Sequence, residues 1–240
     1  MMPTSVAAIP RVTPWRARVA LPLLAALAAI ALSVRSARAN PPLFSSPEPS
    51  WGFEASGGWN SYRLGEFNDS LRSLNQDLGT AFGTIRRGGD FGASLRCWVN
   101  PRVLLRLNLE KHTAVAKSAN IRYDIGPLSL TGGGTYFFPS ERRLRIGVGA
   151  AAGVSAIRGE FKGSQFQFDT RGSGPDLRAT AEAMWPIRDG WFVSGSGGAR
   201  YARIPDVLFG KQGTNTAADF SGFILRVAVG KDGPSLKRSR

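Results

Sequence analysis

The chain has 240 residues, of which 42% are hydrophobic and 20% are charged, and its formal net charge at pH 7 is +14. A single cysteine, Cys97, excludes an intramolecular disulfide, and a single histidine, His112, is the one candidate for imidazole-based catalysis. The basic balance is compatible with nucleic-acid binding, but the positive charges are scattered and form no single run. We therefore expect no nucleic-acid partner.

Residues 1–39 have the pattern of a secretory signal peptide. Arginines ending at Arg18 precede a largely apolar run from Val19 to Val34, and Ala37-Arg38-Ala39 offers a small-residue cleavage site. An uncleaved membrane anchor is the alternative, but this run is shorter than the ~20 residues that span a bilayer. Cleavage leaves 26 basic and 17 acidic residues, a formal charge of +9.

The mature chain divides into three parts by composition. Residues 40–50 are rich in proline and predict an extended linker, and Asn40 excludes a lipid-modified N-terminal cysteine. Residues 51–230 are expected to form one β-barrel domain, and the basic tail 231–240 follows.

From Trp51 onward the sequence has the period of two that is typical of strands with two different faces. In residues 103–112, Leu105, Leu107 and Leu109 alternate with polar or charged residues. The same pattern marks eight segments, 51–60, 89–99, 103–112, 124–138, 144–155, 174–186, 190–203 and 221–230. Each is long enough for a tilted membrane strand of ~9–11 residues.

The connections alternate between tight and long. Tight turns are expected at 100–101, 139–142 and 187–190, and long connections at 64–88, 116–123, 159–172 and 204–218. Three short turns and four long loops are the number expected for an outer-membrane barrel with both ends in the periplasm. The sequence therefore predicts an all-β, antiparallel up-and-down transmembrane β-barrel of eight strands.

The composition of the polar strand faces indicates that they line the lumen and that the apolar faces contact lipid. The polar faces combine glycines and small residues with charged residues, namely Glu54, Arg96, Arg106, Glu110, Arg145, Arg178, Glu182, Arg200 and Arg226. This composition suits a narrow lumen filled by side chains. The arginines outnumber the glutamates and need further partners, such as Asp176, the serines and threonines of segments 124–138 and 190–203, or trapped water. A soluble periplasmic, lipocalin-like barrel that binds an apolar ligand in an apolar interior is the alternative.

Aromatic residues gather near the ends of these segments, as expected for rings that prefer the membrane interface. One belt is predicted at the periplasmic side, from Trp51, Trp98, Phe138, Trp185 and Trp191, and another at the outer side, from Trp59, Tyr62, Tyr123 and Tyr201.

The first long connection has a helical period. Phe67, Leu71, Leu74 and Leu78 recur at spacings of four and three, and Gly79 is a candidate C-cap. We expect a short amphipathic helix in the first outer loop that covers the barrel mouth, with contact to a partner or gating of a ligand as the alternative.

Basic residues lie in or beside the predicted outer loops, at Arg63, Arg86, Arg87, Arg122, Arg158, Lys162, Arg171, Arg203 and Lys211. Arginine suits phosphate geometry. Outer-membrane lipid is therefore the expected partner, with lipopolysaccharide phosphates bound by these loops.

Residues 51–230 resemble the superfamily of small outer-membrane β-barrels, the type of the outer membrane protein A transmembrane domain and its porin-like relatives. The resemblance rests on the strand pattern, the loop asymmetry, the leader and the terminal segment SGFILRVAVG. It implies a Gram-negative outer-membrane location and insertion by the assembly machinery of that membrane. Family members usually end in an aromatic residue, whereas here Val229 stands near that point and the tail follows.

Candidate chemistry is thin, so no catalytic, cofactor-binding or metal-binding residue is assigned. Outer-membrane lipid deacylases carry a His-x-Ser pair, but His112 is followed by Thr113 and Ala114. Glu110 and Glu182 have arginines at neighbouring positions and predict ion pairs, not an acid/base dyad. The glycine-rich stretches lack the lysine of a phosphate loop.

We therefore expect a non-enzymatic integral outer-membrane barrel with a structural or surface-interaction role, no open pore and no cofactor. The alternatives are an envelope-lipid-modifying enzyme that uses His112, the soluble binder of an apolar ligand, and passive transport of a small solute.

Overall fold

The computed structural model describes residues 50–78, 81–118, 121–140, 143–162, 167–209 and 212–233. The expected signal peptide, linker residues 40–49, the C-cap Gly79, Lys211 and tail residues 234–240 lie outside the described residues.

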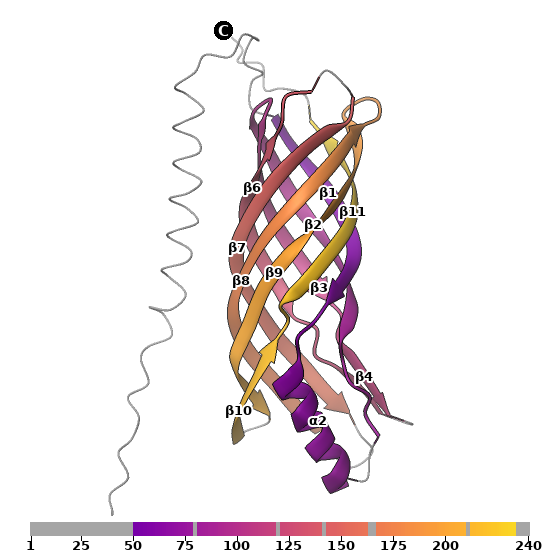
Figure 1. Ribbon diagram of the computed structural model, residues 1–240, viewed down its shortest axis with the longest axis vertical. Helices are drawn as coiled ribbons and strands as arrows, with labels where there is room; N and C mark the ends of the chain where they lie inside the picture. Colours follow the sequence, from indigo (N-terminus) through magenta and orange to yellow (C-terminus); the bar gives the residue numbers. More distant parts are fainter. Residues whose placement is uncertain are drawn as a thin grey trace, which may run out of the picture.

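Eight long strands form an antiparallel barrel (Figure 1). They are β1 (Ser50–Ser61), β2 (Arg87–Asn100), β3 (Val103–His112), β6 (Leu128–Phe137), β7 (Arg145–Lys162), β8 (Gln167–Pro186), β9 (Trp191–Phe209) and β11 (Gly222–Asp232). Each pairs with the next in this order, and β11 pairs with β1. The ring has no free edge, and the expected eight-stranded barrel is confirmed.

Three short connections share one end of the barrel, which we call the short-turn end. Between β8 and β9, Asp189 and Gly190 have φ angles of 55° and 80°, and the N–H of Trp191 donates to the carbonyl of Arg188 at 2.9 Å. Positive φ at both central residues is the geometry that the twist of a two-residue hairpin favours. Between β2 and β3, the Asn100 side chain accepts hydrogen bonds from the backbone N–H groups of Arg102 and Val103.

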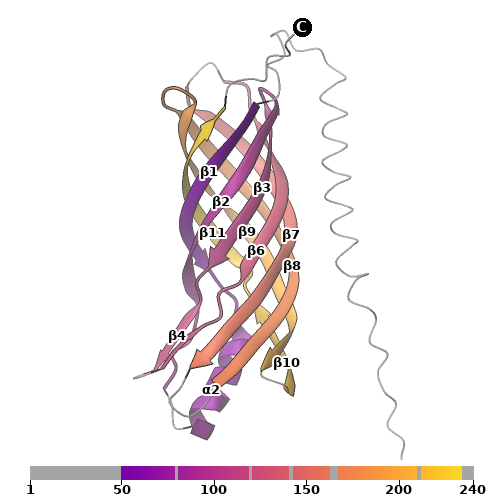
Figure 2. The same ribbon diagram turned by 180° about the vertical axis from the view of Figure 1, so that it is seen from behind.

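The opposite end, the long-loop end, carries the other elements. They are the helix α2 (Gly65–Leu78) and the short strands β4 (Val115–Ser118), β5 (Ile121–Asp124) and β10 (Gln212–Asp219). Figure 1 shows α2, β4 and β10 together at the lower end of the barrel, and Figure 2 shows the same grouping from behind. The predicted helix is confirmed. No helix among the described residues is long and apolar enough to cross a membrane.

Three of the predicted segments at the long-loop end were wrong. The segment 124–138 is not one strand, because Asp124 ends β5 and β6 begins only at Leu128. The connections 159–172 and 204–218 are largely strand, since β7 and β8 stay paired as far as Lys162 and Gln167, and β9 and β10 pair beyond Arg203. The ladders therefore continue past the alternating segments from which the strands were predicted.

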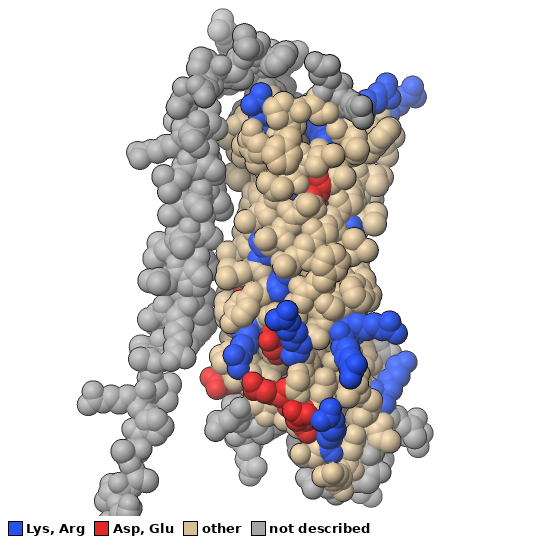
Figure 3. Space-filling model, in the orientation of Figure 1, with Lys and Arg blue, Asp and Glu red and all other residues tan. Residues whose placement is uncertain are grey.

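The apolar faces point outward. Phe91, Leu107, Val148 and Val227 are between 49% and 63% exposed, although each lies in a strand that is paired on both sides. Figure 3 shows a band with few charged side chains around the middle of the visible face. Because an apolar belt of this kind is stable in lipid and not in water, the barrel spans a membrane, and the soluble barrel with an apolar interior is excluded.

Two aromatic residues were placed on the wrong face. Trp98 and Tyr62, expected in the interfacial belts, are buried at 7% and 6% exposure. The other belt residues of the described side chains are exposed, as predicted: Trp51, Trp59, Phe138, Trp185, Trp191 and Tyr201.

Candidate functional site

The lumen is filled by charged side chains in equal numbers. Among the described residues, the arginines that face inward are Arg96, Arg106, Arg145, Arg178, Arg200 and Arg226, and the carboxylates are Glu54, Asp90, Glu110, Asp176, Glu182 and Asp232. The excess of arginine expected from the sequence is therefore balanced by three aspartates. Asp232 was missed because it ends β11 beyond residue 230, where the domain was expected to end, whereas Asp90 was missed although it alternates with the outward Phe91 in β2.

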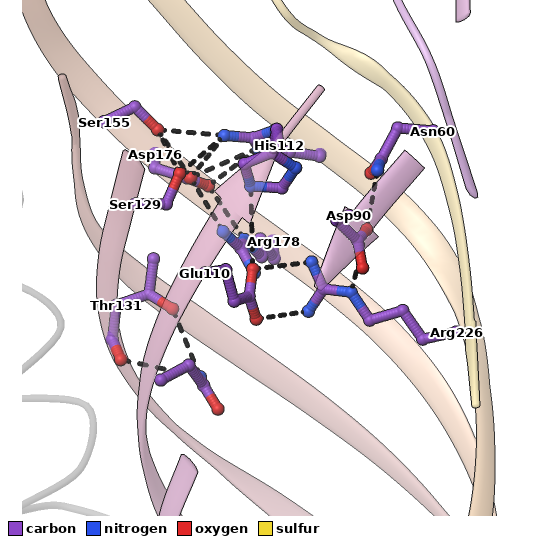
Figure 4. A network of polar contacts seen from close by, with 12 residues as sticks. Asn60, Asp90, Glu110, His112, Ser129, Thr131, Ser155, Asp176, Arg178 and Arg226 are labelled. Atoms are coloured by element: carbon purple, nitrogen blue, oxygen red, sulfur yellow. Dashed lines mark hydrogen bonds and ion pairs between the residues drawn. The ribbon is translucent and has the colours of Figure 1, made fainter. Parts of the chain in front are cut away.

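Asp176 is the centre of the layer of ion pairs nearer the long-loop end. Its carboxylate is completely buried and ion-paired with Arg178 at 2.9 Å and with Arg200 at 2.8 Å. Arg200 also donates to the hydroxyls of Ser129 and Ser155, both at 2.9 Å. Ser129 lies in segment 124–138, where hydroxyl partners were expected, whereas Ser155 lies in segment 144–155, where none was. The Asp176 carboxylate accepts hydrogen bonds from two guanidinium groups (Figure 4).

Glu110 is the second acceptor in the same layer of ion pairs, which we call the outer layer because it lies nearer the long-loop end. It receives two parallel hydrogen bonds from Arg226, at 2.5 and 2.6 Å, and is ion-paired with Arg178. Arg226 also reaches Asp90 at 3.3 Å, and Asp90 accepts a hydrogen bond from Asn60 at 2.6 Å. Figure 4 shows these groups converging from β2, β3, β8 and β11. Bidentate arginine–carboxylate pairs fix geometry as well as charge.

A second layer lies toward the short-turn end. Arg106 forms a bidentate pair with Glu182, with both distances at 2.6 Å. Arg96, whose side chain is fully buried, is ion-paired with Glu54 at 3.1 Å and with Asp232 at 2.9 Å. Glu110 and Glu182 therefore belong to separate layers, each paired with arginine, and the prediction that they form ion pairs is confirmed.

Apolar clusters lie beyond each layer. At the short-turn end, the buried residues Trp98, Leu104, Phe137, Met184 and Phe192 pack together inside the barrel, and the Arg96 guanidinium lies 3.8 Å from the centre of the Phe192 ring. We call this cluster the inner plug. Its position closes the lumen on that side.

A larger cluster closes the long-loop end. Phe67 and Leu71 on α2 are buried at 0% and 4% exposure against residues of the barrel rim and the long connections, including Ile204 and Phe220. We call this cluster the outer cap. Asn68 holds α2 in place, because its side chain exchanges two hydrogen bonds with the backbone of Ile85. The burial of the apolar side of α2 is as expected for a helix that covers the mouth.

A cavity of about 70 Å³ lies between the two layers of ion pairs. Its lining includes Glu54, Arg106 and Glu182 from one layer and Glu110, Arg178 and Arg226 from the other. A polar cavity of this size holds a few water molecules. It is too small for a solute of drug size, for which pockets of ~300–1,000 Å³ are typical.

His112 lies beside the outer layer and is completely buried. Neither imidazole nitrogen has a hydrogen-bond partner among the described residues, and the Glu110 carboxylate is 3.7 Å from Nε2, too far for a hydrogen bond. No described hydroxyl is within hydrogen-bond reach, so the geometry lacks the pairing that would activate a nucleophile. Among the described residues no group of three or more His, Cys, Asp or Glu is placed to hold a metal ion.

The comparisons with known proteins give likeness in structure alone. No protein-family model matches the sequence, and no curated protein matches it. The N-terminal β-barrel domain of Pseudomonas aeruginosa OprF is 13% identical, covers 79% of this chain and 100% of its own, and has a TM-score of 0.44. Neisserial surface protein A is 13% identical, with coverages of 78% and 99% and a TM-score of 0.45.

A major outer membrane protein of Thermus thermophilus is 10% identical, with coverages of 77% and 99% and a TM-score of 0.49. These similarities are too distant to assign an activity. The closed ring of eight antiparallel strands, with apolar side chains outside and charged ones inside, identifies the architecture on its own. The chain has the fold of the small eight-stranded outer-membrane β-barrels.

Proposed function

We propose that this protein is an integral outer-membrane barrel that is closed to solutes, is not an enzyme, and serves the envelope through its outer surface. The leader predicted at residues 1–39 supports export, and the barrel architecture supports insertion by the outer-membrane assembly machinery. The short-turn end then faces the periplasm and the long-loop end faces the outside.

The observation that carries this proposal is that the lumen is blocked at four successive levels. From the periplasmic side these are the inner plug, the Arg106–Glu182 layer, the layer around Asp176 and Glu110, and the outer cap. Because the charged groups of the two layers are already ion-paired, an ion entering the lumen would have to displace existing partners.

Planar-bilayer recording of the refolded protein tests the closed lumen. We expect no discrete conductance steps. If steps occur, Thr180→Phe, which changes the cavity lining, must alter them, while Ala179→Phe, which changes the neighbouring lipid-facing position, must not. Steps that follow this pattern contradict the proposal, because they pass through the lumen.

A ring of basic side chains supports lipopolysaccharide phosphate as the partner of the outer surface. On five of the eight barrel strands, the first charged residue beyond the outward apolar positions is basic, and the same holds just after a sixth strand. These residues are Arg63 after β1, Arg87 on β2, Lys111 on β3, Arg158 on β7, Arg171 on β8 and Arg203 on β9. Figure 3 shows basic side chains, with some acidic ones, gathered at the long-loop end. The side chains of Arg122 and Lys162 lie outside the described residues.

Binding of purified lipopolysaccharide to the refolded protein tests this partner. We expect the affinity to fall as salt is raised, because phosphate contacts by arginine and lysine are screened. An affinity that does not change with salt would contradict a phosphate partner.

A further inference from the structure

One lysine lies on the outer wall among the aromatic residues of the short-turn end. On β11 the outward positions from Phe223 to Val229 are all apolar and between 46% and 63% exposed, and Lys231 is the next outward residue. Among the outward residues described on the eight long strands, it is the one charged residue in the half of the barrel nearer the short-turn end. The chain therefore places a single positive charge where its wall otherwise contacts lipid.

Two aromatic rings fix the position of this lysine. The strand registers place Phe53 on β1 and Trp191 on β9 directly opposite Lys231, one on each side. Two strands that flank a third lie ~9.6 Å apart, yet the centres of the two rings are 6.4 Å apart, in an edge-to-face contact. The rings therefore lean toward each other across β11. The Lys231 ammonium lies 5.5 Å from the centre of the Trp191 ring, within the range of a cation–π contact.

The ammonium has no anionic partner among the described residues. Lys231 forms no ion pair and no side-chain hydrogen bond with them. The adjacent Asp232 points into the lumen, where it is ion-paired with Arg96. At the depth of an aromatic belt, lipid headgroups can supply the opposite charge to a long basic side chain.

A second basic side chain lies at the same corner of the barrel. Arg188 is exposed in the turn between β8 and β9, and the Gly190 carbonyl of that turn accepts a hydrogen bond from the backbone N–H of Asp232 at 2.9 Å. The turn is thus fastened to the end of β11, next to Lys231. Arg188 has no ion pair among the described residues, and the exposed Asp189 beside it is paired with neither cation. Two basic side chains are therefore available to one anion.

A lipid fits this corner better than a free ion does. Lys231 faces outward, and the apolar positions of β11 begin at Val229, directly on its membrane side. A molecule that contacts both carries an anionic group at one end and an apolar chain at the other. In the orientation proposed above, the short-turn end faces the periplasm, and the lipid is then one of the inner leaflet.

We propose that Lys231 and Arg188 form a site for the phosphate of an anionic glycerophospholipid of the inner leaflet, whose acyl chains lie along β11. The choice of leaflet rests on the proposed orientation, whereas the site rests on the residues themselves. Ammonium and guanidinium groups both donate hydrogen bonds to phosphate. The site anchors the barrel at the end opposite to the surface proposed for lipopolysaccharide.

The test compares two double variants of the refolded protein. Lys231→Ser with Arg188→Ser removes the site, and Arg102→Ser with Arg143→Ser removes the same charge from exposed positions in the other two connections of this end. Native mass spectrometry counts bound phosphatidylglycerol, with diacylglycerol, inorganic phosphate and lipid A as separate probes. Anomalous migration of unboiled protein on a denaturing gel confirms that each variant is folded.

We expect the first double variant to lose about tenfold or more in affinity for phosphatidylglycerol, the second less than about twofold, and neither to change in its binding of diacylglycerol. Equal losses in both variants would overturn the site, because a diffuse basic rim would explain them. No loss in the first variant would overturn it as well. Inorganic phosphate that binds as tightly as phosphatidylglycerol would overturn a lipid site.

Lipid A separates this inference from the proposed function. We expect the first double variant to keep its affinity for lipid A, since the basic ring lies at the other end of the barrel. An equal loss with lipid A and phosphatidylglycerol would overturn the choice of the inner leaflet. Should the serine variant fail to fold, Lys231→Met with Arg188→Gln keeps the stems of both side chains and removes both charges. The same tenfold loss is expected, and full affinity would overturn the site.

Discussion

Arg178 lies directly opposite Arg200 in the ladder between β8 and β9, and the buried carboxylate of Asp176 is ion-paired with both. Two like charges are thereby brought together inside the barrel, where little water reaches them. The arrangement makes Asp176 the residue on which the outer layer depends.

Asp176→Asn is expected to lower the free energy of unfolding by about 3–5 kcal/mol, because it leaves two buried guanidinium groups without their shared anion. Urea titration in detergent micelles, followed by the gel shift of the unboiled form, measures the loss. Asp69→Asn is the matched control, since the Asp69–Arg72 pair is largely exposed at 67% and 65%, and its effect should stay within about 0.5 kcal/mol. A similar effect of both substitutions would contradict the bridging role.

His112 presents the opposite case, a buried polar group without a partner. His112→Leu removes two nitrogens that have no hydrogen-bond partner among the described residues, so we expect the free energy of unfolding to stay the same or rise by about 1 kcal/mol. The same urea titration checks this. A decrease of more than about 2 kcal/mol in the free energy of unfolding would contradict this expectation. An altered envelope-lipid composition in cells with this variant would indicate a functional role for the imidazole.

The period of two in the sequence was sufficient for the barrel, because it fixes which side chains face in and which face out. Leu107 is half exposed and its neighbour Arg106 reaches Glu182 in the lumen, as alternation requires. Trp98 was assigned to an interfacial belt because tryptophan favours the membrane interface. Its position predicts the opposite, because it follows the outward Cys97 and must therefore face the lumen. Tyr62 is buried for the same reason, two positions after the inward Asn60.

Other features depend on which strands pair with each other, and the local sequence pattern does not predict that pairing. Asp232 faces the lumen because β11 pairs with β1, placing Gly52 opposite Asp232 beside Arg96. The outer cap likewise joins α2 to Ile204 and Phe220, more than a hundred residues away in the chain. The amphipathic period predicted the helix, but the surface that receives it follows from barrel closure.

The consecutive residues Gly132 and Gly133 on β6 differ in their surroundings, so we expect their alanine variants to differ in stability. A Cβ at Gly132 would meet nothing within 4 Å, whereas a Cβ at Gly133 would lie 2.2 Å from the carbonyl oxygen of Ala150. We expect Gly132→Ala to be neutral and Gly133→Ala to destabilise the barrel by about 1–3 kcal/mol. The temperature at which the unboiled form disappears ranks the two variants, and the reverse order would contradict the close packing of β6 on β7.

The outer cap and the barrel should respond separately to a substitution in α2. Phe67 is completely buried in the cap, which lies outside the eight-stranded ladder. Phe67→Ala is expected to release α2 locally, since truncating a buried phenylalanine costs about 3–5 kcal/mol and the helix has few other apolar anchors. Limited proteolysis should then cut within residues 65–78 at least tenfold faster, while the heat-modifiable gel shift is unchanged.

Arg72→Ala is the control for the same helix, because Arg72 is exposed and touches only Asp69 among the polar contacts described. Its cleavage rate should stay within twofold of that of the parent. If Phe67→Ala instead abolishes the gel shift, the cap is part of the cooperative unit of the barrel, and α2 contributes to assembly as well as closure. Unchanged proteolysis in Phe67→Ala would mean that polar contacts such as Asn68 with Ile85 are enough to hold the helix over the mouth.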